Sequence, residues 1–182
     1  GEEHLVIAMS EPGAGSDIKS LETTVEERGD DLVINGEKIW TSELPDASAA
    51  VTWVKFPEGL GTVILDLDAE GIEVQQHYTN MAGRPQSQFY IEDVTIPEEN
   101  VLTRGRDAFK EQLKSLNWER LGVAAQSTSV AIAAFDQALE YAQDREQFDQ
   151  PIGDFQGIEW KLADMAKKIE ASRALNYRAA QD

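Results

Sequence analysis

The residues best suited to chemistry lie in one run near the start of the chain, Ala8–Asp17 (A-M-S-E-P-G-A-G-S-D). An apolar segment leads into this run and stops at Pro12, which fixes its own φ and restricts the residue before it. Gly13 and Gly15 can adopt positive φ or allow a ligand to lie close to the backbone. We therefore predict a strand end and a glycine turn whose N–H groups and two serine hydroxyls suit a flat, polar ligand such as a nucleotide cofactor.

Two simpler interpretations compete with a cofactor turn. A dinucleotide-binding loop of the form G-x-G-x-x-G would need its third glycine at Ile18, and no long helical pattern follows the run within a βαβ unit. That kind of loop is therefore excluded. An ordinary surface turn is compatible with the same residues and stays open on the motif alone.

The first 103 residues have the pattern of short strands separated by turns. Asn35-Gly36 is the dipeptide favoured in a type I′ hairpin, and it lies between Leu32–Ile34 and Glu37–Trp40, so we expect a tight hairpin there. A second turn is expected at Arg28–Asp31. Further strand-like runs cover residues 23–27, 51–55, 62–67 and 72–74. Short strands with regular turn signals predict a small antiparallel barrel or sandwich.

Helical spacing replaces the strand pattern after Pro97. From Asp107 to about Arg145 apolar residues recur every three or four positions, which predicts one long helix. The segment Pro151–Gly153 interrupts this pattern, and Asp154 is placed to cap the helix that follows. A second amphipathic helix is expected over residues 155–175.

The expected fold class is therefore α+β. A small antiparallel β-barrel or sandwich is expected over residues 1–105, and two long antiparallel helices, half of a helical bundle, over residues 106–182. Two helices cannot bury their apolar stripes against each other alone. We therefore expect the chain to form a homo-oligomer, a dimer or tetramer, or to pack against another subunit.

Composition limits the possible functions. The 182 residues are 41% hydrophobic and carry a net charge of −18, with most of the acidic excess in residues 1–105. Such a field repels phosphate backbones and anionic lipid, so neither nucleic acid nor a membrane is expected as a partner. No apolar run reaches the length of a membrane span, and residues 1–4 lack the layout of a signal peptide. We therefore expect a cytoplasmic location.

Metal and thiol chemistry are also disfavoured. The chain has no cysteine, which removes disulfides, thiolate catalysis and cysteine-bound zinc together. Its two histidines, His4 and His77, cannot build a metal cluster alone. We expect no metal site.

Several motifs, taken in order, resemble the acyl-CoA dehydrogenase family. Besides the Ser-Glu-Pro turn they are K-I-W-T-S at 38–42, F-Y-I-E-D-V-T-I-P at 89–97, Glu119-Arg120, R-x-x-F at 145–148 and Phe155-Gln156. Together they span nearly the whole chain. The resemblance implies the middle β domain and the first part of the C-terminal helical domain, without the family's N-terminal helical domain or its later C-terminal helices.

The resemblance implies FAD as the cofactor. Ser10 would hydrogen-bond the pyrimidine side of the flavin, Trp40 would pack beside the ring system, and Ser42 would donate to the flavin atom that accepts hydride. The same residues are otherwise an ordinary strand-end serine, a core tryptophan and a surface hydroxyl. Further FAD contacts are implied for two residues that would line the ring, Ile7 and Met9, and for three that would reach the FAD of a neighbouring subunit, Arg145, Phe148 and Gln156.

The implied reaction is the oxidation of an acyl-CoA thioester to the 2,3-enoyl-CoA, a step of fatty acid metabolism whose electrons pass to an acceptor like electron-transfer flavoprotein. Ser16 and Arg120 would contact the acyl-CoA, and local cations are needed because the acidic chain repels this anionic ligand. A minority of the family carries the catalytic base immediately before the CoA-contacting arginine. L-N-W-E-R-L at 116–121 reproduces that arrangement. Glu119 is therefore the expected base. The alternative is a solvated helix glutamate, because most of the family carries the base late in its C-terminal half and Glu-Arg also occurs in relatives that use that later base.

Two positions depart from the family pattern. Asp149 stands where the family usually has Gly, and Glu43 follows Trp40-Thr41-Ser42 where Asn or Gly is common. An acid at either position could weaken phosphate or flavin binding. Two other functions stay open: an oxygen-using relative, such as an acyl-CoA oxidase or flavin monooxygenase, and a non-catalytic assembly module of the same fold.

Overall fold

The computed structural model describes residues 4–29, 31–105 and 107–181, without the side chain of Phe109. The chain divides into two compact units, Gly1–Leu113 and Lys114–Asp182, which we call the β unit and the helical unit. The predicted domain boundary between residues 105 and 106 stays a prediction, and residue 106 itself lies outside the described residues.

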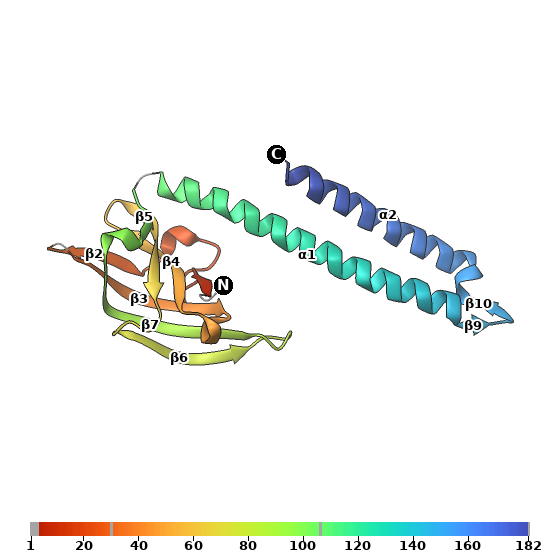
Figure 1. Ribbon diagram of the computed structural model, residues 1–182, viewed down its shortest axis with the longest axis horizontal. Helices are drawn as coiled ribbons and strands as arrows, with labels where there is room; N and C mark the ends of the chain where they lie inside the picture. Colours follow the sequence, from red (N-terminus) through yellow and green to blue (C-terminus); the bar gives the residue numbers. More distant parts are fainter. Residues whose placement is uncertain (1–3, 30, 106, 182) are drawn as a thin grey trace. The chain divides into compact units, whose positions relative to one another are not determined.

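Eight strands form one mixed sheet in the β unit (Figure 1). Its order is β6-β7-β3-β2-β4-β5-β8, and β1 pairs with β4. The strands are β1 (Leu5–Ala8), β2 (Thr24–Arg28), β3 (Asp31–Ser42), β4 (Ala49–Phe56), β5 (Gly59–Asp66), β6 (Ile72–Thr79), β7 (Pro85–Ile96) and β8 (Val101–Thr103). Short 3-10 helices join some of them, namely η1 (Ile18–Ser20), η2 (Leu44–Asp46) and η3 (Glu98–Asn100).

Most of the strand pairs are antiparallel, as the turn pattern predicts. Two pairs are parallel: β1 with β4 along its length, and β2 with β4 at the single pair Thr24 and Lys55. Both parallel pairs join strands that do not follow each other in the chain, so local turn signals do not reveal them. The predicted α+β class, with a β domain before two long helices, is confirmed.

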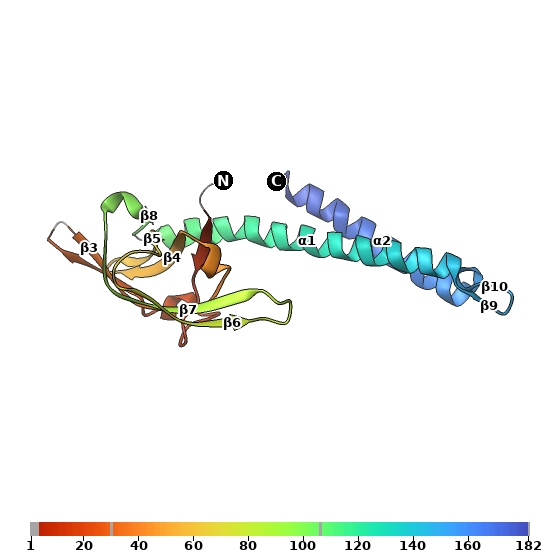
Figure 2. The same ribbon diagram turned by 60° about the horizontal axis from the view of Figure 1, so that its bottom comes forward.

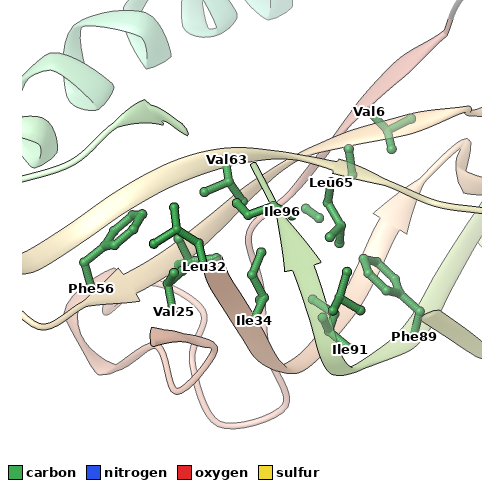
Figure 3. Packing of buried hydrophobic residues seen from close by; sticks show 14 of the residues in the cluster. Val6, Val25, Leu32, Ile34, Phe56, Val63, Leu65, Phe89, Ile91 and Ile96 are labelled. Carbon is green, nitrogen blue, oxygen red and sulfur yellow. The ribbon is translucent and has the colours of Figure 1, made fainter. Parts of the chain in front are cut away.

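The core of the β unit follows from strand alternation (Figure 3). In β1, Val6 and Ala8 are buried while Leu5 and Ile7 are exposed, because successive side chains point to opposite faces. Each fully buried Leu, Ile, Val or Phe contributes about 1.5–3 kcal/mol to stability. The labelled members of the cluster are Val6, Val25, Leu32, Ile34, Phe56, Val63, Leu65, Phe89, Ile91 and Ile96.

The predicted hairpin at Asn35-Gly36 is wrong. β3 runs through both residues without reversing, from Asp31 to Ser42. The pairing of β3 with β7 shifts register between Ile34 and Gly36, where Asn35 alone faces Glu92 and Asp93, so the extra residue of this bulge is on β7. The side-chain oxygen of Asn35 accepts a hydrogen bond from the N–H of Asp93 at 2.9 Å, which stabilises the irregular pairing.

A close approach of two backbones explains Gly36. A Cβ added there would lie 2.6 Å from the Cα of Thr23, so no larger residue fits without a shift of the backbone. The chain instead reverses between β2 and β3 beside Gly29, whose φ is 72°. This agrees with the second predicted turn, although Asp30 within it lies outside the described residues.

Two long helices follow the β domain, as predicted. α1 (Ala108–Asp144) and α2 (Gln156–Ala179) run antiparallel and side by side (Figures 1 and 2). The amide nitrogen of Asn176 donates to the hydroxyl of Thr128 at 3.0 Å and ties α2 to α1. No described residue of α2 is buried, and neither helix is apolar enough over its described length to cross a membrane.

The connection between the helices is short and structured. It contains β9 (Glu146–Gln147), β10 (Gln150–Pro151) and the 3-10 helix η4 (Ile152–Asp154). The predicted cap at Asp154 is wrong, because Asp154 belongs to η4 and Phe155 stands at the N-cap of α2 without a side-chain capping bond.

Candidate functional site

A buried ion pair anchors the turn that follows β1. Nζ of Lys38, in β3, lies 2.8 Å from Oε1 of Glu11, and the two side chains are 0% and 5% exposed. The Glu11 carboxylate also accepts the backbone N–H groups of Glu22 at 2.6 Å and Thr23 at 3.0 Å. Lys38 donates a further hydrogen bond to the carbonyl oxygen of Met9 at 3.3 Å. The pair therefore ties the turn, the start of β2 and the middle of β3 together.

The pKa values of the pair are shifted by this environment. Burial would raise the pKa of Glu11, but the N–H of Glu22 and the ammonium of Lys38 outweigh burial and hold this pKa below its ordinary value. Burial lowers the pKa of Lys38, and the hydrogen bond to Glu11 offsets this effect only in part. These are the signs expected for a carboxylate held by several donors and an ammonium withdrawn from water.

Ser10 keeps two hydrogen-bond donors available. Its carbonyl oxygen accepts the N–H of Ile39 at 2.9 Å, which joins the turn to β3 directly before Trp40. Within the described part of the chain, neither the N–H nor the hydroxyl of Ser10 has a hydrogen-bond partner. Ser10 and Met9 are half-buried, and Ile7 is 45% exposed. Two available donors on a fixed turn suit a flat acceptor such as the carbonyl edge of a flavin.

The glycines of the turn are open rather than strained. Neither Gly13 nor Gly15 has a positive φ, so that prediction is wrong, and a Cβ added at either would meet nothing within 4 Å. The other predicted alternative, room for a ligand beside the backbone, fits this open space. Ser16 is exposed, and the residue that caps η1 is Asp17 rather than Ser16.

Trp40 projects from an irregularity in β3. Its φ is 61°, a left-handed conformation that is rare for a bulky residue, and the pairing with β7 shifts register between Lys38 and Thr41. Bulges of this kind change the direction of a side chain. The indole is 51% exposed and lies against Tyr78, with ring centroids 4.8 Å apart and planes at 46°. An exposed fraction of 51% does not fit a core tryptophan.

Ser42 and Glu43 lie at the end of β3. Ser42 pairs with Gln86, whose side-chain amide donates to the Ser42 hydroxyl at 3.4 Å, so the hydroxyl proton of Ser42 remains available to another acceptor. Glu43 has φ 58°, a conformation that Gly and Asn adopt easily, which explains why the family often has those residues there. The Glu43 carboxylate lies 3.2 Å from the guanidinium of Arg84, which offsets its charge.

Glu119 and Arg120 lie on α1 in the helical unit, and both are exposed. Arg120 donates to the side-chain oxygen of Asn117 at 2.8 Å. Glu119 has no ion pair or hydrogen bond from its side chain among the described residues. A groove of about 540 Å³ separates α1 from α2 and is lined by Trp118 and Tyr177 among others, but Glu119 is not part of its lining.

The remaining predicted FAD contacts surround the connection between α1 and α2. Arg145 is exposed, and its guanidinium makes no ion pair with any described residue. Phe148 is 90% exposed, and its ring lies edge-on to that of Phe155, with centroids 6.3 Å apart. Asp149 has φ 61°, which explains the usual glycine of the family at this position. Gln156 is the exposed first residue of α2.

The predicted site residues thus lie in two groups, one in each unit. Ser10, Trp40 and Ser42 share the end of β3 and its neighbouring turn in the β unit, whereas Glu119, Arg120 and the connection residues belong to the helical unit. Among the described residues, no group of His, Cys, Asp and Glu is placed to hold a metal ion.

Sequence reasoning missed the ion pair and the partner of Trp40. A signal existed for Lys38, because it follows the buried Ile34 by an even number of positions in a strand, the spacing of one sheet face. A lysine on a core face requires a counter-charge. No local signal identifies Tyr78, which reaches Trp40 from β6 through tertiary packing.

Two sequence profiles of one family cover most of the chain. The profile described as acyl-CoA dehydrogenase, middle domain, matches residues 6–94, and the profile described as acyl-CoA dehydrogenase, C-terminal domain, matches residues 107–182. The first match contains the ion pair, Ser10 and Trp40, and the second contains both long helices.

Curated relatives cover almost the whole chain. The caffeyl-CoA reductase-Etf complex subunit CarC of Acetobacterium woodii is 39% identical over 187 residues, which cover 99% of this chain and 49% of that protein. The mitochondrial short-chain specific acyl-CoA dehydrogenase of Rattus norvegicus is 35% identical over 180 residues, covering 95% and 44%. The chain therefore spans about half the length of the curated relatives that it matches.

Solved structures agree with these matches. Butyryl-CoA dehydrogenase from Megasphaera elsdenii superposes with a TM-score of 0.90 at 30% identity, covering 97% of this chain and 48% of that one. A glutaryl-coenzyme A dehydrogenase in complex with glutaryl-CoA gives 0.88 at 32% identity, covering 96% and 46%. These matches confirm the resemblance, and the chain belongs to the acyl-CoA dehydrogenase family.

Proposed function

We propose that this chain is part of an FAD-dependent acyl-CoA dehydrogenase that oxidises an acyl-CoA thioester to the 2,3-enoyl-CoA. The observation that carries the proposal is Ser10, whose N–H and hydroxyl have no partner among the described residues although both neighbouring carbonyls are bound. Trp40 offers a half-exposed ring and Ser42 an available proton at the end of the same strand. Together they supply the donors and the apolar surface that a flavin requires.

Different residues of this chain would carry out different parts of the reaction. FAD, when bound, accepts the hydride that leaves the β carbon of the thioester. Glu119 is the proposed base that removes the α proton, and its carboxylate has no competing partner among the described residues. Arg120 and Ser16 are the proposed acyl-CoA contacts, and the cation at Arg120 offsets part of the repulsion from the net charge of −18.

A second copy of the chain would complete the FAD site. Arg145 is exposed and without an ion pair among the described residues, so its planar guanidinium is available for two hydrogen bonds to a pyrophosphate. Phe148 is almost fully exposed, and Gln156 is the exposed first residue of α2. These features support a homotetramer in which each FAD contacts two subunits.

The visible absorption spectrum of the purified protein, with and without added FAD, tests the proposal. We expect flavin absorption bands that bleach when a saturated acyl-CoA is added without oxygen. A bound flavin that bleaches and then recovers rapidly in air would support an oxygen-using relative instead. A protein that binds no FAD would contradict the proposal and favour the assembly module.

A second candidate function is the reverse reaction, the reduction of a 2,3-enoyl-CoA. Two of the matched relatives are reductases by name, the caffeyl-CoA reductase subunit and the 3-(aryl)acrylate reductase of Clostridium sporogenes at 36% identity. The same site could therefore reduce a 2,3-enoyl-CoA. The test compares two rates without oxygen: reoxidation of the reduced flavin by an enoyl-CoA, and reduction of the oxidised flavin by the saturated thioester. A faster reoxidation would favour this direction.

The remaining assignments belong to the same proposal. An electron-transfer flavoprotein is the proposed redox partner, supported by the Etf complex named for the Acetobacterium woodii relative. A role in fatty acid metabolism is part of the same proposal. The cytoplasmic location stays a prediction.

A further inference from the structure

We propose that Lys38, held by Glu11, is a positioning residue that orients the Met9–Ser10 peptide and strengthens its N–H as a donor to the flavin. The inference rests on the proposed function, because it assigns a role to a residue beside the FAD site. It concerns a buried charge that neither substrate nor cofactor would touch.

The geometry limits what Lys38 can do. Its ammonium is fully buried and has two neighbours that the structure identifies, the Glu11 carboxylate at 2.8 Å and the Met9 carbonyl at 3.3 Å. The Met9 carbonyl and the Ser10 N–H belong to one peptide group. Lys38 therefore acts on the carbonyl end of the peptide whose N–H end is available to a ligand.

Polarisation connects the two ends. An ammonium group that donates a hydrogen bond to the carbonyl oxygen draws electron density toward that oxygen. This makes the N–H of the same peptide a stronger donor. The effect is larger in a buried site because water does not screen it. The Ser10 carbonyl is bound in turn by the N–H of Ile39 at 2.9 Å, so the turn cannot rotate away from β3.

Stability alone is a weak reason for this pair. Well-packed apolar residues can replace a buried ion pair at little or no loss of stability, because desolvation of the charges offsets their attraction. Phe89, the register partner of Lys38 on β7, belongs to the apolar core cluster, so an apolar side chain at position 38 would have an apolar neighbour. A role in placing the Ser10 donor explains why charged groups are present here.

The test compares three variants of the purified holoprotein with the wild type. Lys38→Met removes the buried cation, Glu11→Gln removes its partner, and Lys55→Met is the matched control at an exposed lysine of the same unit. The measurements are the dissociation constant of FAD, the positions of the visible flavin bands and the reduction potential of the bound flavin.

We expect Lys38→Met to weaken FAD binding about tenfold, because the Ser10 N–H becomes a weaker and less well oriented donor, to shift the flavin bands and to make the reduction potential more negative. Reduction adds negative charge to the flavin, and Lys38→Met leaves the Glu11 carboxylate without its cation nearby. Glu11→Gln is expected not to make the potential more negative, since the carboxylate is absent. Lys55→Met is expected to match the wild type in all three measurements.

Each outcome decides whether Lys38 positions the Ser10 donor or has only a structural role. Lys38→Met protein that retains the wild-type bands and potential overturns the inference, as does an equal negative shift in Glu11→Gln. Should Lys38→Met not fold, Lys38→Gln, which keeps a polar group without the charge, is measured in the same way and decides by the same criteria. Wild-type protein that binds no FAD overturns the proposed function itself, and the inference with it.

Discussion

At the scale of single residues, the donors and charges around Ser10 form the proposed cofactor contact of the β unit. Lys38 and Glu11 hold the turn from inside, and the Ser10 N–H and hydroxyl remain available at its surface. The carboxylate and ammonium are therefore internal supports, whereas the reactive chemistry is assigned to exposed groups such as Glu119. These two kinds of residue are expected to respond differently to substitution.

Removing the Glu11 charge is expected to cost stability in a way that depends on pH. Glu11→Gln leaves Lys38 buried without its partner, which should lower the free energy of unfolding by about 3 kcal/mol near pH 7. The folded-state pKa of Glu11 lies below its ordinary value, so the contribution of the carboxylate is present above that ordinary value and is lost as pH falls through the lowered pKa. Urea unfolding should therefore show that the difference in free energy of unfolding between variant and wild type narrows as the pH is lowered below the ordinary pKa of 4.5.

Asp164→Asn is the control for this experiment. Asp164 is a carboxylate on α2 whose pKa is lowered to about 2 by hydrogen bonds from Lys167 and Lys168, but it lies in solvent. Exposed ion pairs contribute little, so this variant should unfold almost like the wild type near pH 7. If the difference in free energy of unfolding between Glu11→Gln and the wild type stays constant as the pH is lowered, the stabilising role of the Glu11 carboxylate is contradicted.

Glu119→Gln tests the proposed base. The amide keeps the size of the side chain but cannot accept the α proton, so flavin reduction by acyl-CoA should fall by at least about 10²-fold. FAD binding should not change, because Glu119 is not a proposed cofactor contact. Stopped-flow absorbance under anaerobic conditions measures the reduction rate, and near-normal reduction would show that the base lies elsewhere.

At the scale of elements, the pairing of β3 with β7 has two irregularities. At the first, Asn35 of β3 faces two residues of β7, and the adjacent Gly36 allows the backbone of Thr23 to approach closely. At the second, β3 carries the extra residue before Thr41, and Trp40 turns outward against Tyr78. Between them Lys38 points into the core. A regular strand would present these side chains on strictly alternating faces, so the irregularities determine which of them reach the candidate site.

Gly36→Ala is expected to destabilise the β unit. The new Cβ would lie 2.6 Å from the Cα of Thr23, and relief of this overlap requires a backbone shift that costs about 1–3 kcal/mol. Gly15→Ala is the matched control, because its Cβ meets nothing within 4 Å and its φ is not positive. Thermal unfolding of the two variants measures the difference, and equal midpoints would argue against the close approach.

At the scale of the whole molecule, the helical unit presents apolar side chains that lack partners among the described residues. Seven large apolar side chains described on α1 and α2 are more than half exposed, namely Trp118, Val123, Val130, Tyr141, Trp160, Leu175 and Tyr177. Exposed apolar surface of this extent usually marks an interface. We therefore expect the protein to self-associate at micromolar concentration, and light scattering that shows a stable monomer would contradict this.

Arg145→Ala separates FAD sharing from assembly. If Arg145 binds the pyrophosphate of a neighbouring subunit's FAD, its loss should weaken FAD binding about tenfold or more and leave the oligomer intact. Arg178→Ala, at an exposed arginine in the last turn of α2, is the control. Fluorescence titration measures the FAD affinity, and light scattering on the same samples measures the oligomeric state. Unchanged FAD affinity in Arg145→Ala would show that Arg145 is not part of the FAD site.

The sequence by itself determined the α+β class, the two long helices and the family. Apolar periodicity changes from strand-like to helical after Pro97 because each element buries one face, and that change is a local property of the chain. The family motifs are likewise short runs of residues, so each can be recognised without knowledge of what it contacts.

Only the tertiary structure decided how the turn, β3 and its irregularities support one another. Asn35-Gly36 has the local preference of a hairpin, but pairing with β7 and contact with Thr23 hold it inside a strand. The partners of Glu11 and Trp40, Lys38 and Tyr78, are distant in sequence and reach them through the fold. Such contacts depend on how strands pair across the sheet, a long-range choice that local propensity does not contain.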